Sequence, residues 1–220
     1  ERIGSSHLPE LLASYDHPDE IDWEQLPDRF VIKVSHGCGM NILCRDKTQF
    51  DRAEAIVKLT QWQSVESPAY TKFREWAYRG GSRKIIVEEF LENEDGNPPD
   101  DYKVFCFNGK PKFVQVDFDR FDEHRRGFYD LDWTQLPFAW RIKTKEVDSP
   151  PPRGLEKMIE IAEVLSKDLP FARIDLYEIG DRVLLGEITL YPGAGYGHYV
   201  PAHYDEVVGD ILTLPDPIKS

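Results

Sequence analysis

Hydrophobic residues alternate with polar ones along much of the chain, with the period that is typical of β-strands. Runs of β-branched and aromatic residues predict strands over residues 30–34, 42–44, 84–91, 102–107, 111–118, 171–177 and 183–189. Apolar residues at helical spacing predict helices over residues 51–63, 68–79 and 155–165. Because most strands follow one another as hairpins and the helices form separate blocks, we expect an α+β fold with antiparallel sheets.

The weaker stretches of the pattern indicate loops and a boundary. Residues 1–28 predict one or two helical turns followed by a loop, and residues 119–140 predict irregular structure. Residues 93–101 are polar and contain Gly and Pro, which is typical of a connecting loop. We therefore expect an N-terminal lobe over residues 1–92 and a C-terminal lobe over residues 93–220.

Composition and charge narrow the functional classes. The 220 residues carry 40 acidic and 27 basic side chains, a formal charge of −13, which disfavours a nucleic-acid-binding role. No apolar run reaches the roughly 18 residues of a membrane span. Cys38, Cys44 and Cys106 fit neither a zinc ribbon nor a redox pair, so a reducing cytoplasm is the simplest setting. The first residue is Glu1 rather than Met, which is compatible with a piece of a longer multidomain protein.

Two acidic residues, Asp175 and Glu187, lie in strands that are otherwise apolar. A buried carboxylate is unfavourable unless a partner neutralises it. A connecting loop with an odd number of residues places both acids on one face of the hairpin, whereas an even loop places them on opposite faces. On one face they form a site for a hard divalent cation such as Mg2+, with Thr189 as a further oxygen donor. The alternative is an outward face on which both acids are solvated and pair with Arg173.

A lysine and a glycine-bearing loop indicate a phosphate site nearer the start of the chain. Lys33 lies inside an apolar strand, and Ser35 follows on the same side of that strand. The loop beyond contains Gly37 and Gly39, whose backbone amides can approach a phosphate closely, and His36 as a further donor. The segment is neither a Walker A motif nor a dinucleotide fingerprint, so an ordinary hairpin tip is the alternative.

Further charged residues lie in the second half of the chain. Asp101 and Lys103 share one face of a predicted strand, where Lys103 either contacts a phosphate or pairs with Asp101. A dense basic cluster predicts either an anion site or a solvated loop that balances its own acids, Asp117 among them. The cluster comprises Arg120, His124, Arg125 and Arg126.

Three segments carry a resemblance to a known family. They are FVIKVSHGCGMN (Phe30–Asn41), DYKVFCFNGKPKF (Asp101–Phe113), and RIDLY followed by GEITLYPGAG (within Arg173–Gly195), the last being the most specific. Together they resemble the TupA-like, teichuronopeptide-biosynthesis branch of the ATP-grasp superfamily. The resemblance covers about Trp23 to the C-terminus. It implies two α+β lobes that hold ATP between them, with the usual N-terminal domain of the superfamily absent or truncated.

The resemblance also implies roles for individual residues. ATP phosphates would be held by Lys33 and covered by a lid that contains Ser35, His36, Gly37 and Gly39. The adenine-side hinge would comprise Glu88, Glu89, Phe90 and Leu91. Magnesium would be bound by Asp175, Glu187 and Thr189, the last at a position where many relatives have Asn. The catalytic cations would be Lys103, Arg120 and Arg173, with Arg125 and Arg126 as further candidates for a phosphate or carboxylate clamp.

The implied activity is an ATP- and Mg2+-dependent carboxylate–amine ligase that works through an acyl phosphate. Its substrates would be an amine and a carboxylate, such as a uronic acid of a bacterial surface polysaccharide precursor, in the bacterial cytoplasm. The alternatives are a glycosyltransferase of the same pathway, in which the two acids serve a nucleotide-sugar and its metal, and a non-catalytic nucleotide-binding module.

Overall fold

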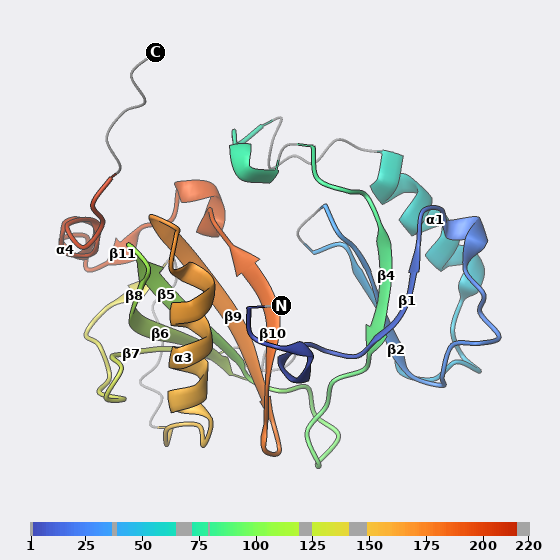
Figure 1. Ribbon diagram of the computed structural model, residues 1–220, viewed down its shortest axis with the longest axis horizontal. Helices are drawn as coiled ribbons and strands as arrows, with labels where there is room; N and C mark the ends of the chain where they lie inside the picture. Colours follow the sequence, from blue (N-terminus) through green and yellow to red (C-terminus); the bar gives the residue numbers. More distant parts are fainter. Residues whose placement is uncertain are drawn as a thin grey trace. The chain divides into compact units, whose positions relative to one another are not determined.

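The computed structural model describes residues 2–36, 39–64, 72–78, 80–118, 125–140 and 149–214. The chain divides into two compact units, Pro9–Leu91 and a second unit that joins Glu1–Leu8 to Glu92–Ser220 (Figure 1). Each unit has its own antiparallel sheet and its own hydrophobic core. Within the described residues, no helix combines the length and hydropathy needed to cross a membrane.

The unit Pro9–Leu91 is built on a four-stranded sheet in the order β1-β4-β2-β3. The strands are β1 (Leu11–Tyr15), β2 (Phe30–Val34), β3 (Asn41–Cys44) and β4 (Ile85–Glu89). Helix α1 (Arg52–Ser64) contacts β2 and contributes the fully buried Leu59 to the core of this unit. Because Phe30, Ile32 and Val34 of β2 all face that core, the intervening Lys33 lies on the opposite face of the sheet.

The second unit is built on a five-stranded sheet in the order β10-β9-β5-β6-β7. The strands are β5 (Asp101–Phe107), β6 (Lys110–Phe118), β7 (Arg125–Tyr129), β9 (Phe171–Ile179) and β10 (Arg182–Thr189). Helix α3 (Leu155–Ser166) packs across one face, in contact with β5, β6 and β9 (Figure 1). The short strands β8 (Ala139–Trp140) and β11 (Tyr199–Val200) pair with each other, and α4 (Tyr204–Gly209) follows.

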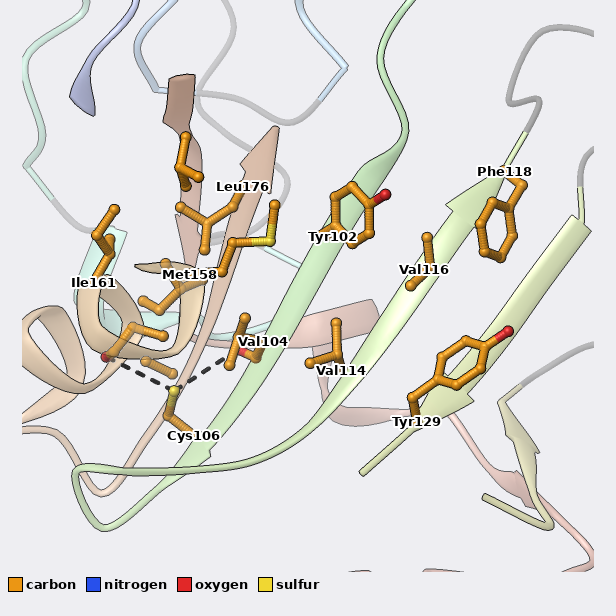
Figure 2. Packing of buried hydrophobic residues seen from close by; sticks show 14 residues of the cluster. Tyr102, Val104, Cys106, Val114, Val116, Phe118, Tyr129, Met158, Ile161 and Leu176 are labelled. Carbon is orange, nitrogen blue, oxygen red and sulfur yellow. Dashed lines mark hydrogen bonds between the residues drawn. The ribbon is translucent and has the colours of Figure 1, made fainter. Parts of the chain in front are cut away.

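The sheet face under α3 is apolar. Val104 of β5 and Val116 of β6 belong to one core cluster with Met158 and Ile161 of the helix (Figure 2). Cys106 belongs to this core, with its Sγ 3.8 Å from the carbonyl oxygens of both Val104 and Ala162. Burial raises the pKa of the Cys106 thiol to about 11, so the thiol is protonated at neutral pH and behaves as a small core residue.

The opposite face of the same sheet carries the odd-numbered residues of β5, β6 and β9, and it has two halves. One half is an aromatic cluster around the stacked pair Phe105 and Phe113, whose ring centroids are 4.7 Å apart. Trp140 of β8 and Val208 of α4 complete this cluster. The other half is charged, and it contains the residues of the candidate site.

Both long hairpins of this sheet combine a two-residue turn with one extra residue. Ile179 pairs with Arg182 across the turn Gly180–Asp181, and the register then shifts at Gly186, so that Glu187 lies opposite Asp175. Phe107 likewise pairs with Lys110 across Asn108–Gly109, and a shift at Lys112 brings Gln115 opposite Lys103. A two-residue turn alone pairs odd with even positions, and a single-residue bulge restores odd-with-odd pairing. The bulges therefore decide which side chains share a face.

Three predictions from the sequence are wrong. Residues 1–28 contain strand β1 between two 3-10 turns, Ser5–His7 and Pro18–Glu20, because β1 fills the edge position beside β4. Residues 72–78 contain only the 3-10 turn Trp76–Tyr78 instead of a helix, and Arg74 has a positive φ of 59° that no α-helix accommodates. Residues 68–71 and 79 of the predicted helix lie outside the described residues. Residues 119–140 include strands β7 and β8.

The other predicted elements are confirmed. The strands of the first unit lie at 30–34, 41–44 and 85–89, and those of the second lie within or close to the predicted ranges. The helices predicted over 51–63 and 155–165 correspond to α1 and α3.

The turn that sets the β5–β6 register generates a prediction. Gly109 and Gly180 both have a positive φ, of 75° and 58°, but only a Cβ on Gly109 meets backbone, at 2.6 Å from the Lys167 carbonyl oxygen. Both Ala variants bear the cost of the left-handed conformation, about 1 kcal/mol. We expect Gly109→Ala to lose about 1–3 kcal/mol more of the free energy of unfolding than Gly180→Ala, measured by urea denaturation. Equal losses would show that the Lys167 segment yields and does not fix the turn.

Candidate functional site

The charged half of the sheet face is a row of side chains that crosses all five strands. The pairing places Asp175 of β9 opposite both Glu187 of β10 and Lys103 of β5. Asp101, two residues before Lys103, lies opposite Asp117 of β6. Asp117 in turn lies opposite Arg126 of β7, and Thr189 lies opposite Arg173. Asp101 and Thr189, which are 88 positions apart in the sequence, therefore belong to one surface because of strand order and register.

Lys103 lies at the centre of the row and is only 7% exposed. Its Nζ donates hydrogen bonds to a carboxylate oxygen of Asp101 and, at 3.0 Å, to Oδ2 of Asp175. Oδ2 of Asp117 lies 3.8 Å away. Burial of an ammonium is strongly unfavourable without such partners, so the three acids are what allows the Lys103 side chain to be buried.

Asp117 links the row to β7. Its Oδ1 accepts a hydrogen bond from Nε of Arg126 at 2.5 Å, and its two oxygens lie 3.2 and 3.1 Å from the Gln115 amide nitrogen. Arg126 also donates from Nη1 to the Trp140 carbonyl oxygen at 3.4 Å. Asp117 is therefore a buried member of the row, so the alternative in which it is an acid of a solvated loop does not apply to it.

Arg173 joins the row to β10. Its Nε and Nη2 donate to Oδ1 and Oδ2 of Asp175, each at 2.7 Å, and Nη2 also donates to Thr189 Oγ1 at 3.0 Å. Burial alone lowers the pKa of the guanidinium, but Asp175, together with the charges of Glu187 and Asp101, outweighs it and raises that pKa. The alternative in which Arg173 pairs with Asp175 is thus part of the structure, although Asp175 is buried at 3% exposure rather than solvated.

The charges of the row balance. Three carboxylates, of Asp101, Asp117 and Asp175, contact three cations, of Lys103, Arg126 and Arg173. Glu187 adds a negative charge at the exposed end of the row. The site is therefore neutral where it is buried and acidic where solvent reaches it, which suits a divalent cation that arrives with an anionic ligand.

In the unit Pro9–Leu91, two of the predicted nucleotide residues contact each other. Lys33 Nζ lies 2.5 Å from Oε2 of Glu88 across neighbouring strands. Glu89 instead turns to the chain start, where its Oε1 accepts a hydrogen bond from the Glu10 amide at 2.9 Å. The two acids of the predicted hinge thus have different partners, and Glu88 is the one tied to the predicted phosphate lysine.

The loop after β2 is fastened at its first residue. The Ser35 hydroxyl donates to the Ser82 carbonyl oxygen at 2.5 Å and accepts from the Lys84 amide at 3.0 Å. Gly39 has a φ of 70°, and among the described residues no atom lies within 4 Å of a Cβ at its position. His36 is half-buried, while Gly37 lies outside the described residues.

Two guanidinium groups lie over the ring of Phe90, the aromatic residue of the predicted hinge. The guanidinium carbons of Arg29 and Arg45 lie 4.4 and 5.2 Å from the ring centroid of Phe90. Leu91, the last residue of the predicted hinge, is half-buried. These contacts place Phe90 beside the start of β2, which Arg29 directly precedes, and the end of β3, which Arg45 directly follows.

The predicted residues of the second unit gather as follows. The structure brings together Lys103, Arg173, Asp175, Glu187 and Thr189, whereas Arg120 lies outside the described residues. Gln115 was missed by the sequence reasoning. Its signal is its odd number on β6, which places it on the same face as Lys103 once the bulge is included.

The donor set can be tested against the magnesium ion that the family resemblance implies. Mg2+ is bound through one or two carboxylates, with phosphate and water oxygens completing its octahedron. Asp175 and Glu187 supply two carboxylates on one face, with the Thr189 hydroxyl two residues beyond Glu187. No group of three His, Cys, Asp or Glu side chains in the described part of the chain forms a metal site, so the protein would supply two acids at this position. That number and type of donors fit Mg2+.

The row generates a prediction about stability. Lys103→Met leaves three buried carboxylates without their central cation, and we expect it to reduce the free energy of unfolding by about 3–5 kcal/mol. Lys110→Met is the matched control, because Lys110 lies on the next strand and its pair with Glu163 is solvent-exposed; removal of such a pair costs about 1 kcal/mol or less. Urea denaturation of both variants measures the difference, and similar losses would contradict the described role of Lys103.

Comparison with solved structures finds ATP-grasp proteins. The D-alanine–D-alanine ligase of Bacillus anthracis is 14% identical, over 94% of this chain and 61% of that chain, with a TM-score of 0.50. A RimK domain ATP-grasp protein from Sphaerobacter thermophilus is 11% identical, over 93% of this chain and 60% of that chain, with a TM-score of 0.42. This chain therefore spans less than two thirds of the length of either structure. The first match confirms the α+β, ATP-grasp type of fold.

The sequence comparisons give the family. No curated protein matches the sequence significantly. The profile described as TupA-like ATPgrasp matches residues 3–213, which is nearly the whole chain. The chain belongs to the TupA-like ATP-grasp family.

Proposed function

We propose that this protein is an ATP- and Mg2+-dependent carboxylate–amine ligase that works through an acyl phosphate. Family membership supports an ATP-dependent ligase in general. The observation that carries the narrower proposal is the pair of carboxylates, Asp175 and Glu187, opposite each other beside a lysine and an arginine. Phosphoryl transfer to a carboxylate requires acidic side chains that hold a metal ion and basic side chains that stabilise anionic oxygens, both on one surface.

The residues of the row have distinct roles in this proposal. Asp175 and Glu187 would hold Mg2+, which when bound draws negative charge from phosphate oxygens. Arg173 has a guanidinium whose planar donors match a phosphate or a carboxylate in two places, so it would orient the γ-phosphate or the acceptor. Lys103 holds Asp175 in place, and its contact with a phosphate stays a prediction.

The residues of the unit Pro9–Leu91 would bind the rest of the nucleotide. Lys33 and the loop from Ser35 to Asn41 would contact the phosphates, and the segment Glu88 to Leu91 would contact the base. The ion pair of Lys33 with Glu88 supports this assignment, because it holds the lysine on the face of the sheet away from the core. The tie of Ser35 to Ser82 and Lys84 fixes the point at which the loop begins.

The chemistry follows in two steps. An oxygen of the acceptor carboxylate attacks the γ-phosphorus, the bond to the β-phosphate oxygen breaks, and ADP leaves. The amine then attacks the acyl carbon, loses a proton and expels inorganic phosphate, which leaves an amide. Stabilisation of charge as it moves between oxygens is the main task of the protein in both steps. We place this reaction in the bacterial cytoplasm and name a uronic acid of a surface polysaccharide precursor as the acceptor class, on the family resemblance.

A labelling experiment tests the proposal. The purified chain is incubated with ATP, Mg2+, uronic acids labelled with 18O in the carboxylate, and a panel of amines. We expect ADP release that needs both acceptor and amine, with one 18O atom transferred to inorganic phosphate. Release of UDP or CMP from nucleotide-sugars in place of ADP would indicate a glycosyltransferase, and ATP binding without turnover on any acceptor would indicate a binding module.

A single substitution tests the metal assignment. Glu187 is exposed, so Glu187→Gln should fold normally while it removes one of two carboxylates from the cation. We expect Mg2+-dependent ADP formation to fall by at least about 100-fold. Glu178→Gln, a carboxylate-to-amide change in the same hairpin, is the control, because its contact with the Gly154 amide needs only an oxygen acceptor. Unchanged turnover in Glu187→Gln would remove Glu187 from the metal site.

A further inference from the structure

One guanidinium contacts the ligand set assigned to the cation. Arg173 binds both oxygens of Asp175 and the hydroxyl of Thr189, and the charge of Glu187 contributes to its raised pKa. The side chains of Arg173 and Asp175 are 12% and 5% exposed, so this contact is largely shielded from water. Arg173 therefore uses the same oxygen atoms that a divalent cation would need.

Two cations cannot use these oxygens in the same way. Each oxygen of Asp175 accepts a short hydrogen bond from Arg173, and Oδ2 accepts a further one from Lys103. Oδ1 accepts one hydrogen bond and Oδ2 accepts two, so a metal ion reaches Asp175 directly either beside the guanidinium on Oδ1 or in place of a donor on Oδ2. In either position the mutual repulsion of the two cations opposes their binding to one carboxylate at the same time. Lys103 has two further carboxylate partners, Asp101 and Asp117, which hold it in place if its contact with Asp175 is lost. Arg173 is therefore the donor that we expect a cation to displace from Asp175.

We propose that Arg173 and the divalent cation compete for Asp175 and Thr189, so that cation binding releases the guanidinium to bind an anionic phosphate or carboxylate group. This inference rests on the proposed cation site. The exchange replaces a guanidinium of charge +1 at Asp175 with a cation of charge +2, and the anionic group that pairs with the released guanidinium offsets the added positive charge.

The exchange also explains why a metal and an anion would bind together. A buried guanidinium without a counter-ion is strongly unfavourable, so the released Arg173 requires an anionic partner. The cation therefore prepares the site for the anion, and by linkage the anion favours the cation to the same extent. Guanidinium matches the oxygens of phosphate and carboxylate equally well, and these are the two groups that react in the proposed ligase.

Manganese titration tests the competition without any catalytic turnover. Free Mn2+ is measured by electron paramagnetic resonance on nucleotide-free protein. We expect Arg173→Gln to bind Mn2+ about tenfold more tightly than the unaltered protein, because the competitor is gone. Arg173→Lys, which keeps the charge but loses the paired donors, should fall between the two.

Arg126→Gln is the matched control. Arg126 also pairs with a buried aspartate of the same row, but with Asp117 rather than Asp175. We expect its Mn2+ affinity to change less than twofold. Equal tightening in Arg126→Gln and Arg173→Gln would show a general charge effect and overturn the proposal, as would unchanged or weaker binding in Arg173→Gln.

Two further measurements separate this inference from the proposed function and from failure to fold. Asp175→Asn and Glu187→Gln should each weaken Mn2+ binding; if neither does, the cation site itself is wrong, whatever the behaviour of Arg173. In the unaltered protein, Mg2+ should shift the Nε–H nuclear magnetic resonance signal of Arg173 and leave that of Arg126 in place. An unmoved Arg173 signal at saturating Mg2+ would overturn the exchange even if Arg173→Gln does not fold.

Discussion

Buried carboxylates and cations in alternation along one face of a five-stranded sheet are the feature on which the rest of this molecule depends. Asp101, Asp117 and Asp175 are each within hydrogen-bonding distance of a lysine or an arginine. None of these charges is tolerable alone in an apolar setting, and together they cancel. Register, strand order and the two bulges serve to put opposite charges against one another, and the aromatic half of the same face is kept separate from them.

The same balance limits what the site can do. A ligand can bind without a large electrostatic cost only if each ion pair that it breaks is replaced by a new one, since otherwise a buried charged group would be left without a partner. A divalent cation together with an anionic group meets that condition, and neither does so alone. The buried part of the row is thus stable because its charges cancel, and the same condition limits which ligands the proposed site would accept.

Sequence reasoning reached the hairpins and the residues of the site, but not the geometry that joins them. Strand alternation placed Lys103, Arg173 and Asp175 correctly, because period-two patterns fix the face of a residue within its own strand. Loop length alone would have put Asp175 and Glu187 on opposite faces, since the turn Gly180–Asp181 is even. The bulge at Gly186 reverses that outcome, and its local signal, an isolated glycine inside a strand pattern, was not used. Strand β1 and the turn at Trp76–Tyr78 were missed for a similar reason, because tertiary pairing and a left-handed Arg74 override weak helical patterns.

The central claim is that the Asp175–Glu187 pair holds a cation that carries anionic oxygens. The most direct test is the anomalous scattering of Mn2+ in crystals grown with a non-hydrolysable ATP analogue. The account predicts a manganese peak at about 2.0–2.3 Å from carboxylate oxygens of both Asp175 and Glu187, with a phosphate oxygen also bound. Manganese held elsewhere, while Asp175 keeps both of its hydrogen bonds to Arg173, would contradict it.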